Sequence, residues 1–191
     1  MARPGAVDLY WLPLGAGGRS VRFNGRVYEA VASALQRRRR FDLYHSALEV
    51  TSPEGVYVIE MAPELSGPDG DHGAVAGGSV GSPLLGRSAL FRYEVRCWLD
   101  GSIPDLAEAV DSPRRLTDDP DVARRLLEHV REVPAPTWGR DELRAGEMGN
   151  SNSVVAWLLA SAGLDAETIA PPAGGRAPGW HAGAAVAAGR T

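Results

Sequence analysis

The stretch that most constrains how this chain can fold is residues 148–159, Met-Gly-Asn-Ser-Asn-Ser-Val-Val-Ala-Trp-Leu-Leu. Asn150 and the polar residues after it are of the types that cap helix N-termini. The run that follows is apolar almost all round, which predicts a buried helix over Asn150–Ala162. Gly163 suits the left-handed position that ends many helices. The first turn of such a helix has free N–H groups and a partial positive charge.

A second informative stretch predicts a strand that carries a histidine. Residues 41–50 form this strand, Val56–Met61 form its neighbour, and residues 51–55 supply the turn between them. An antiparallel pairing of Val50 with Gly55 places His45 opposite Glu60. His45 and Glu49 also share one face of their strand, because side chains alternate along it. This register sets an imidazole beside a carboxylate.

The remaining periodic stretches predict an α+β fold. Residues 7–12 and 89–98 read as two more strands, and Cys97 falls on the packed side of the second one. Pro120 occupies a favoured first position of another helix. We therefore expect an antiparallel sheet against which three helices pack, over Asn24–Gln36, Asp119–Glu132 and Asn150–Ala162.

The segments between these elements are rich in glycine and proline. Residues 62–86 predict a long loop with Asp69–Gly73 at its tip, where a polar tip is favoured over a metal site. Gly15–Ser20 lacks the Gly-Lys-Ser/Thr ending of a phosphate loop and reads as a plain glycine loop. An irregular C-terminal arm is expected at about 165–191, with a last strand over Ala182–Ala188, although alanine and glycine are poor strand formers.

Composition limits the class of protein. The 191 residues carry a net charge of −4, which argues against nucleic-acid binding as the main role. Arg37–Arg40 is expected to complement the dipole at a helix C-terminus, and an anionic ligand or acidic partner is the alternative. A single cysteine excludes a disulfide framework and multi-cysteine zinc sites. We expect one cytoplasmic domain spanning 1–191, without a membrane span, cofactor or metal.

Two stretches together supply the parts that acyl transfer requires. Such chemistry needs a nucleophile, a base within hydrogen-bond reach, a group that orients the base, and donors for the oxyanion. Ser151 at the helix N-terminus is the candidate nucleophile and His45 the candidate base. Glu60 or Glu49 could orient His45. Backbone N–H groups of the first helical turn, or the side-chain amides of Asn150 and Asn152, could hold the oxyanion.

The order of these elements resembles a known superfamily. A histidine strand, a partner strand and a later helix that opens Asn-Ser and runs into Val-Ala-Trp-Leu-Leu is similar to the circularly permuted papain-like proteins. These include NlpC-like amidases, lecithin retinol acyltransferase-like proteins and PPPDE-type isopeptidases. The resemblance covers residues 41–61 and 149–163, and it implies roles for Ser151, His45 and Glu60 in cleaving or transferring amide or ester groups. The whole chain also resembles a group of actinobacterial proteins, which implies no function.

The chain departs from that pattern at the nucleophile, where the family has cysteine. A helix N-terminus and an imidazolium readily ionise a thiol, but serine needs a true general base. Ser151 could belong to a working serine hydrolase or acyltransferase on an unidentified small molecule or peptide. It could belong to an inactive relative that kept the cleft for binding, or it could be an engineered replacement of cysteine. The residues at 150–153 also suit capping without any chemistry.

Overall fold

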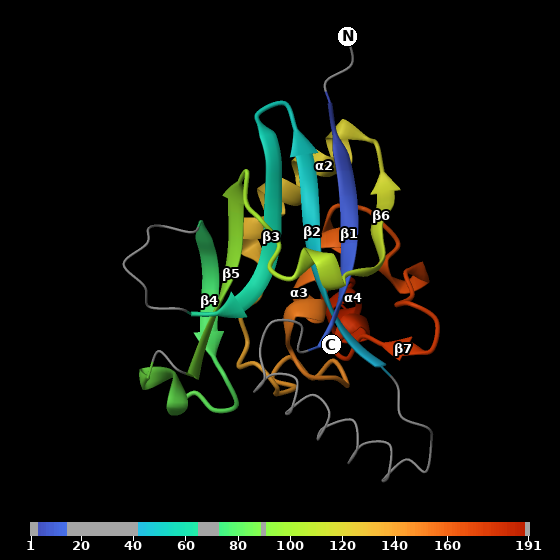
Figure 1. Cartoon of the computed structure of the whole chain (residues 1–191). Coiled ribbons are helices and arrows are strands. Elements are labelled where there is room, and N and C mark those ends of the chain that lie inside the picture. The colour runs from blue at the N-terminus through green and yellow to red at the C-terminus, as the bar shows by residue number, and fades with distance from the viewer. Residues whose placement is uncertain (1–3, 15–41, 65–72, 89–90, 190–191) are drawn as a thin grey trace.

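The computed structural model describes residues 4–14, 42–64, 73–88 and 91–189. These residues form the predicted α+β fold, with an open antiparallel sheet (Figure 1). Six strands follow one another in the order β4-β5-β3-β2-β1-β6, and a short seventh strand pairs with β2 in parallel. The strands are β1 (Ala6–Pro13), β2 (Asp42–Ser52), β3 (Gly55–Pro63), β4 (Ala74–Ser79), β5 (Arg92–Leu99), β6 (Val110–Thr117) and β7 (Gly175–Arg176).

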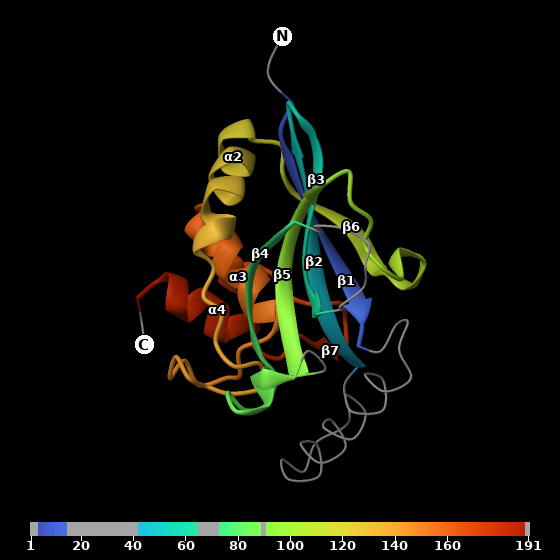
Figure 2. The ribbon, with the colours of Figure 1, turned by 90° about the vertical axis from the view of Figure 1, so that its left-hand side faces the viewer.

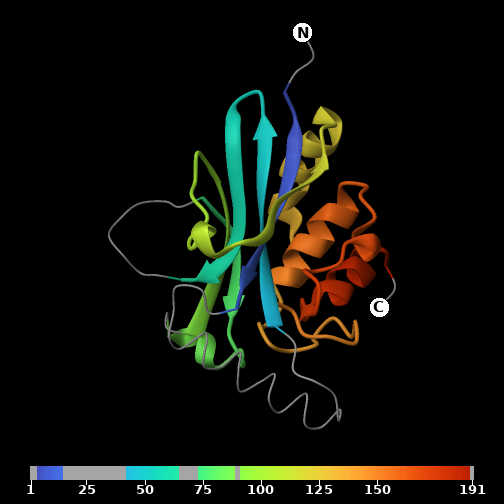
Figure 3. The same ribbon diagram turned by 45° about the vertical axis from the view of Figure 1, so that its right-hand side comes forward.

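The α-helices of the described residues lie on one face of the sheet. They are α2 (Pro120–His129), α3 (Ser151–Ser161) and α4 (Trp180–Ala187). Figure 2 shows all three on the same side, with the segment that leads into β6 on the other, and Figure 3 shows α3 and α4 side by side. No helix in these ranges has the length and hydropathy needed to cross a membrane.

Apolar side chains are buried on both faces of the sheet. Alternate residues of β1 point to opposite faces, so Leu9 and Trp11 join the core beneath the helices while Tyr10 and Leu12 do not. The helices close the larger core with residues such as Leu126, Leu158 and Leu159. The smaller cluster, on the other face, comprises Tyr10, Leu12, Ala47, Val58 and Ile103.

The two helices predicted within these ranges are confirmed. Asn150 is the N-cap of α3, and Gly163 follows the helix with φ of 94°. Asp119 caps α2 by accepting a hydrogen bond from the Asp121 backbone N–H, and the last predicted turn, residues 130–132, is a 3-10 helix. Local cap chemistry therefore sets where both helices begin.

The predicted register of β2 and β3 is wrong by two residues. Gly55 pairs with Ser52 rather than Val50, and Val50 pairs with Tyr57. The reason is a tighter turn at residues 53–54, in which Ser52 Oγ bonds to Glu54 Oε2 and accepts the Glu54 backbone N–H. The predicted pairing of His45 with Glu60 is therefore wrong: His45 lies outside the paired part of β2 and β3, and its partner on β1 is Leu12. A two-residue slip keeps each side chain on its predicted face.

Part of the predicted loop at 62–86 is a strand. Residues 74–79 form β4, which pairs with β5 at the sheet edge. The prediction failed because alanine and glycine are poor strand formers. Here small residues are required, since a Cβ on Gly78 would lie 2.8 Å from the Tyr93 hydroxyl oxygen.

The expected irregular C-terminal arm also holds regular structure. The predicted strand at Ala182–Ala188 is wrong, because residues 182–187 lie in helix α4 and Ala188 is its C-cap. Alanine favours a helix, and Gly183 allows the close approach of α4 to α3. Strand β6 was not predicted, since its charged residues and Pro113 are typical of an edge strand, not a central one.

Several sequence predictions lie outside the described residues. These are the Gly15–Ser20 loop, the Asn24–Gln36 helix, the Arg37–Arg40 run and residues 69–72 of the predicted loop tip.

Candidate functional site

Asn150 serves as the cap of α3. Its side-chain oxygen accepts the backbone N–H groups of Asn152 and Ser153 at 2.9 and 3.2 Å, and Ser153 Oγ accepts the Asn150 backbone N–H at 2.8 Å. Asn150 Nδ2 also donates to the Pro178 carbonyl at 2.7 Å. This reciprocal arrangement is a capping box, so Asn150 and Ser153 have clear structural roles.

Asn152 ties the start of α3 to the sheet. Its Nδ2 donates to the carbonyls of Tyr44 and Pro178 at 2.9 and 3.0 Å, and its Oδ1 accepts from Ser46 Oγ at 2.9 Å. The residue is 1% exposed. Because these bonds use both amide N–H groups, the Asn152 side chain has no donor left for an oxyanion.

Ser151 is the first residue of α3 and is 6% exposed. Its hydroxyl makes no hydrogen bond with any described residue. The Asn150 side chain caps the backbone N–H groups of Asn152 and Ser153, so it leaves the Ser151 backbone N–H uncapped. Ser151 is therefore buried at a helix N-terminus, and no base among the described residues bonds to its hydroxyl.

His45 lies on the other side of β2. Ser46, the next residue, reaches α3 through Asn152, so strand alternation directs His45 to the opposite face. Burial lowers the pKa of His45 to about 4, and the negative charge of Asp105 opposes this shift only in part. Within the described chain the ring makes no hydrogen bond. His45 is thus a neutral, half-buried imidazole at neutral pH.

The two candidate orienting acids have other partners. Glu60 Oε1 lies 3.6 Å from Arg96 Nη1. Burial raises the pKa of Glu60 to about 7, although Arg96 lowers it. Glu49 Oε2 accepts the Tyr10 hydroxyl at 2.7 Å. Neither carboxylate bonds to His45.

The six candidate residues therefore form two groups. His45, Glu49 and Glu60 share the face away from the helices, as the alternation predicted. Ser151 sits with Asn150 and Asn152 at the start of α3, on the helix side. The structure does not join Ser151 to His45 by a hydrogen bond. Among the described residues there is also no cluster of three or more His, Cys, Asp or Glu side chains that could hold a metal ion.

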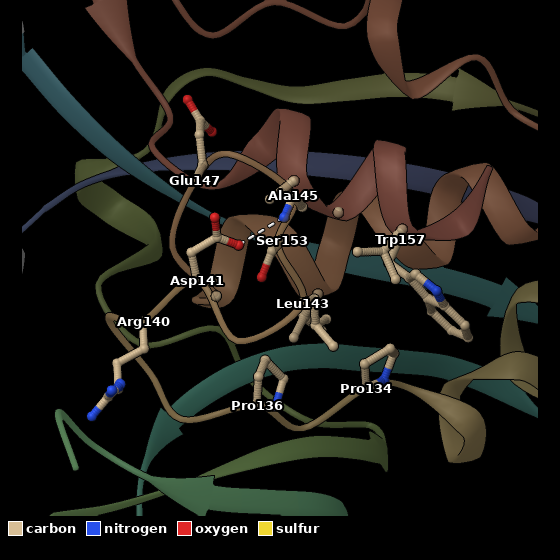
Figure 4. A pocket seen from close by; sticks show the side chains of 14 residues that line it. Pro134, Pro136, Arg140, Asp141, Leu143, Ala145, Glu147, Ser153 and Trp157 are labelled. Carbon is tan, nitrogen blue, oxygen red and sulfur yellow. Dashed lines mark hydrogen bonds between the residues drawn. The ribbon is translucent and has the colours of Figure 1, made fainter. Parts of the chain in front are cut away.

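A pocket that the sequence did not predict lies next to the first turns of α3. Figure 4 shows it between α3, α4 and the segment 134–149. We call it the α3–α4 slot. It is narrow, with room inside for about one water-sized sphere, and its empty space of about 360 Å³ includes the open solvent at its mouth. Its apolar walls include Pro134, Pro136, Leu143, Val154, Trp157 and Val186.

The segment that covers this slot is a closed loop. Its ends are joined where the Gly139 backbone N–H donates to the Gly149 carbonyl and the Gly149 N–H donates to the Arg140 carbonyl, each at 2.9 Å. Inside the loop, the Asp141 carboxylate accepts the backbone N–H groups of Ala145 and Gly146. Such self-bonded loops hold side chains in fixed places.

Glu147 connects this loop to the next helix. Its carboxylate accepts the backbone N–H of Gly179, the N-cap residue of α4, at 2.8 Å. A negative charge is favourable there because of the helix dipole. Sequence reasoning missed the slot. The available signals were the prolines at 134 and 136 and an acidic, glycine-containing loop just before the α3 cap.

Two other clefts of the described residues are larger. One lies between the β2–β3 turn and α2, where prolines and aliphatic residues alternate with charged side chains, and Arg124 there pairs with Asp121 and Glu128. The second holds Arg176 and His181 beside Glu147 and Glu167. Apolar walls with a few polar groups are typical of small-molecule sites, and the α3–α4 slot, which has such walls, also lies beside the first turns of α3.

No family model matches this chain, and no similar protein was found among curated proteins or solved structures. The papain-like resemblance therefore remains a prediction.

Proposed function

We propose that this chain is a catalytically inactive binding protein of papain-like type. The observation that carries the proposal is the lack of a hydrogen bond between the Ser151 hydroxyl and the His45 ring among the described residues. A serine hydroxyl must pass its proton to a base during attack, so the two groups need to be in reach of each other.

The surroundings of the candidate base also favour binding over catalysis. A serine hydrolase uses an acid to orient its histidine and to stabilise the imidazolium. Glu60 instead faces Arg96, and Glu49 accepts the Tyr10 hydroxyl. His45, with its pKa lowered to about 4, is a weak base.

The α3–α4 slot is the proposed ligand site. Its walls are mostly apolar, which is typical of sites for small organic molecules. The covering loop is fixed at both ends, so a ligand enters by displacing wall side chains such as Leu143 and Trp157.

A fluorophosphonate reagent tests this proposal against serine catalysis. We expect intact-mass measurements to find no adduct on the wild type, Ser151→Ala or His45→Ala, under conditions that fully label a known serine esterase. An adduct mapped to Ser151 in the wild type and lost in both variants would establish an activated nucleophile and refute the proposal.

A further inference from the structure

The sheet face away from the helices holds one guanidinium between two carboxylates. Glu60 of β3 and Arg96 of β5 are partners in the strand pairing, and Glu94 lies two residues before Arg96 on the same face. Glu60 is 4% exposed and Arg96 is 8% exposed. Among the described residues, no other cation pairs with Glu60 or Glu94. The two carboxylates therefore compete for one nearly buried cation.

Arg96 is shared unequally between the two carboxylates. Its Nε lies 2.5 Å from Glu94 Oε1, which is the short distance of a charge-assisted hydrogen bond. Its Nη1 lies 3.6 Å from Glu60 Oε1, which is too long for a hydrogen bond. Glu60 Oε1 is buried and makes no hydrogen bond with any described residue. This arrangement satisfies Glu94 and leaves Glu60 with an unpaired oxygen.

Such an arrangement suits a protonated Glu60 better than an ionised one. A buried carboxylate needs a bonded cation or hydrogen bonds, whereas a neutral carboxyl group has no charge to compensate. Burial accordingly raises the pKa of Glu60 to about 7, while the charge of Arg96 lowers it and that of Glu94 raises it. Glu60 therefore changes its charge near neutral pH.

We propose that these three side chains form a pH-sensitive switch in which Arg96 changes its partner. While Glu60 is protonated, Arg96 is bonded to Glu94. When Glu60 loses its proton, the guanidinium moves to Glu60 and its bond to Glu94 weakens. This inference goes beyond the proposed binding function and does not depend on the α3–α4 slot, which lies on the helix side of the sheet.

The other charged groups near the switch do not compete with it. Those on the same face and at its margin have partners of their own, which are Asp105 for His45, Tyr10 for Glu49, Arg92 for Glu64 and Arg115 for Asp8. Strand β4, the other neighbour of β5, contains no titratable residue. Of the described charges, those of Arg96 and Glu94 are the ones that shift the pKa of Glu60.

Trp98 gives the switch an output. The centre of its ring lies 6.0 Å from Arg96 Cζ, on the same face of β5. The indole lies against the backbone of Gly101, where a Cβ would be 2.0 Å from Trp98 Nε1. Gly101 belongs to the segment that carries Ile103 into the smaller apolar cluster. A movement of Arg96 therefore changes the surroundings of Trp98 and of this segment.

The test is an NMR titration of the isotope-labelled full chain between about pH 5 and about pH 8. It records the side-chain carboxyl carbons of Glu60 and Glu94, the Nε of Arg96 and the indole N–H of Trp98. We expect all four signals to change with one shared midpoint near pH 7.

Two variants supply reference spectra for the two positions of Arg96. Glu60→Gln keeps Arg96 on Glu94 at every pH, so its Arg96 and Trp98 signals should match those of the wild type at low pH and should not titrate. Glu94→Gln leaves Arg96 to Glu60, so its Arg96 signal should match the wild type at high pH and the Glu60 midpoint should fall. Glu64→Gln, which removes the carboxylate paired with Arg92, is the matched control and should titrate like the wild type.

The wild-type titration alone can overturn the proposal, even if a variant fails to fold. If the Glu60 carboxyl titrates while the Arg96 Nε and Trp98 signals stay constant, Arg96 does not change its partner. If Glu60 keeps one charge state over the whole range, there is no switch. Either result leaves the proposed binding function untouched, because the α3–α4 slot contains none of these residues.

Discussion

At the residue scale, the most unusual group is the buried Glu60. It is 4% exposed, and Oε1 makes no hydrogen bond within the described chain. Burial raises its pKa from the ordinary 4.5 to about 7, although the neighbouring Arg96 lowers it. The folded state therefore binds the Glu60 proton more tightly than the unfolded state does. Its contribution to stability is complete below about pH 4.5 and is lost as the pH rises through 7.

Replacing Glu60 should remove this pH dependence. We expect the wild type to lose about 2 kcal/mol more unfolding free energy than Glu60→Gln between pH 5 and pH 8. Urea denaturation at both pH values measures the difference. Glu64→Gln, which removes a carboxylate paired with the half-exposed Arg92, is the control and should retain the wild-type slope. If the unfolding free energy of Glu60→Gln depended on pH as steeply as that of the wild type, Glu60 would not be the source of the pH dependence.

Neighbouring residues of one helical turn should respond very differently to truncation. Asn152→Ala leaves Ser46 Oγ and the Tyr44 carbonyl buried without their partner, so we expect a loss of about 2–4 kcal/mol. Ser151→Ala removes a hydroxyl that bonds to no described residue and should change stability by less than about 0.5 kcal/mol. Equal losses in urea denaturation would mean that the Ser151 hydroxyl has a structural partner.

At the element scale, the contact between α3 and α4 shapes the slot. A Cβ on Gly183 would lie 2.1 Å from the Ser153 carbonyl oxygen, so only glycine permits this approach. We expect Gly183→Ala to cost about 1–3 kcal/mol through overpacking, although alanine is by itself the better helix former.

Thermal unfolding with circular dichroism checks the Gly183 prediction. Ala185→Gly, on the same helix, is the control for backbone propensity and should cost about 1 kcal/mol. A Gly183→Ala variant that is more stable than the wild type would show that the two helices are not in close contact.

At the scale of the whole molecule, one sheet carries both clusters of buried side chains. Because β1 and β2 contribute residues to each cluster, neither can unfold without the other. We expect a single cooperative unfolding transition, in which far-UV circular dichroism and tryptophan fluorescence coincide in urea. Separate transitions would contradict a single domain. The fluorescence comes from tryptophans distributed along the chain, at Trp11, Trp98, Trp138, Trp157 and Trp180.

The sequence by itself determined the elements whose signals are local. The apolar run after Asn150 and the Gly163 stop define α3, and Asp119-Pro120 defines the start of α2. Alternation was enough to predict β2, β3 and β5, and to place His45, Glu49 and Glu60 on one face. These features depend on residues within a turn or two of one another.

Only the tertiary structure decided which groups meet. The tight turn at residues 53–54 moved the β2–β3 register, and Arg96 from β5 became the partner of Glu60. Small residues that looked like loop or strand became β4 and α4, because their packing partners, Tyr93 and Ser153, come from distant segments. The bond between Ser46 and Asn152 fixed the face of β2 that meets α3, and so left His45 on the other side from Ser151. Each of these outcomes depends on contacts between segments far apart in the chain, and local propensity and periodicity do not encode such contacts.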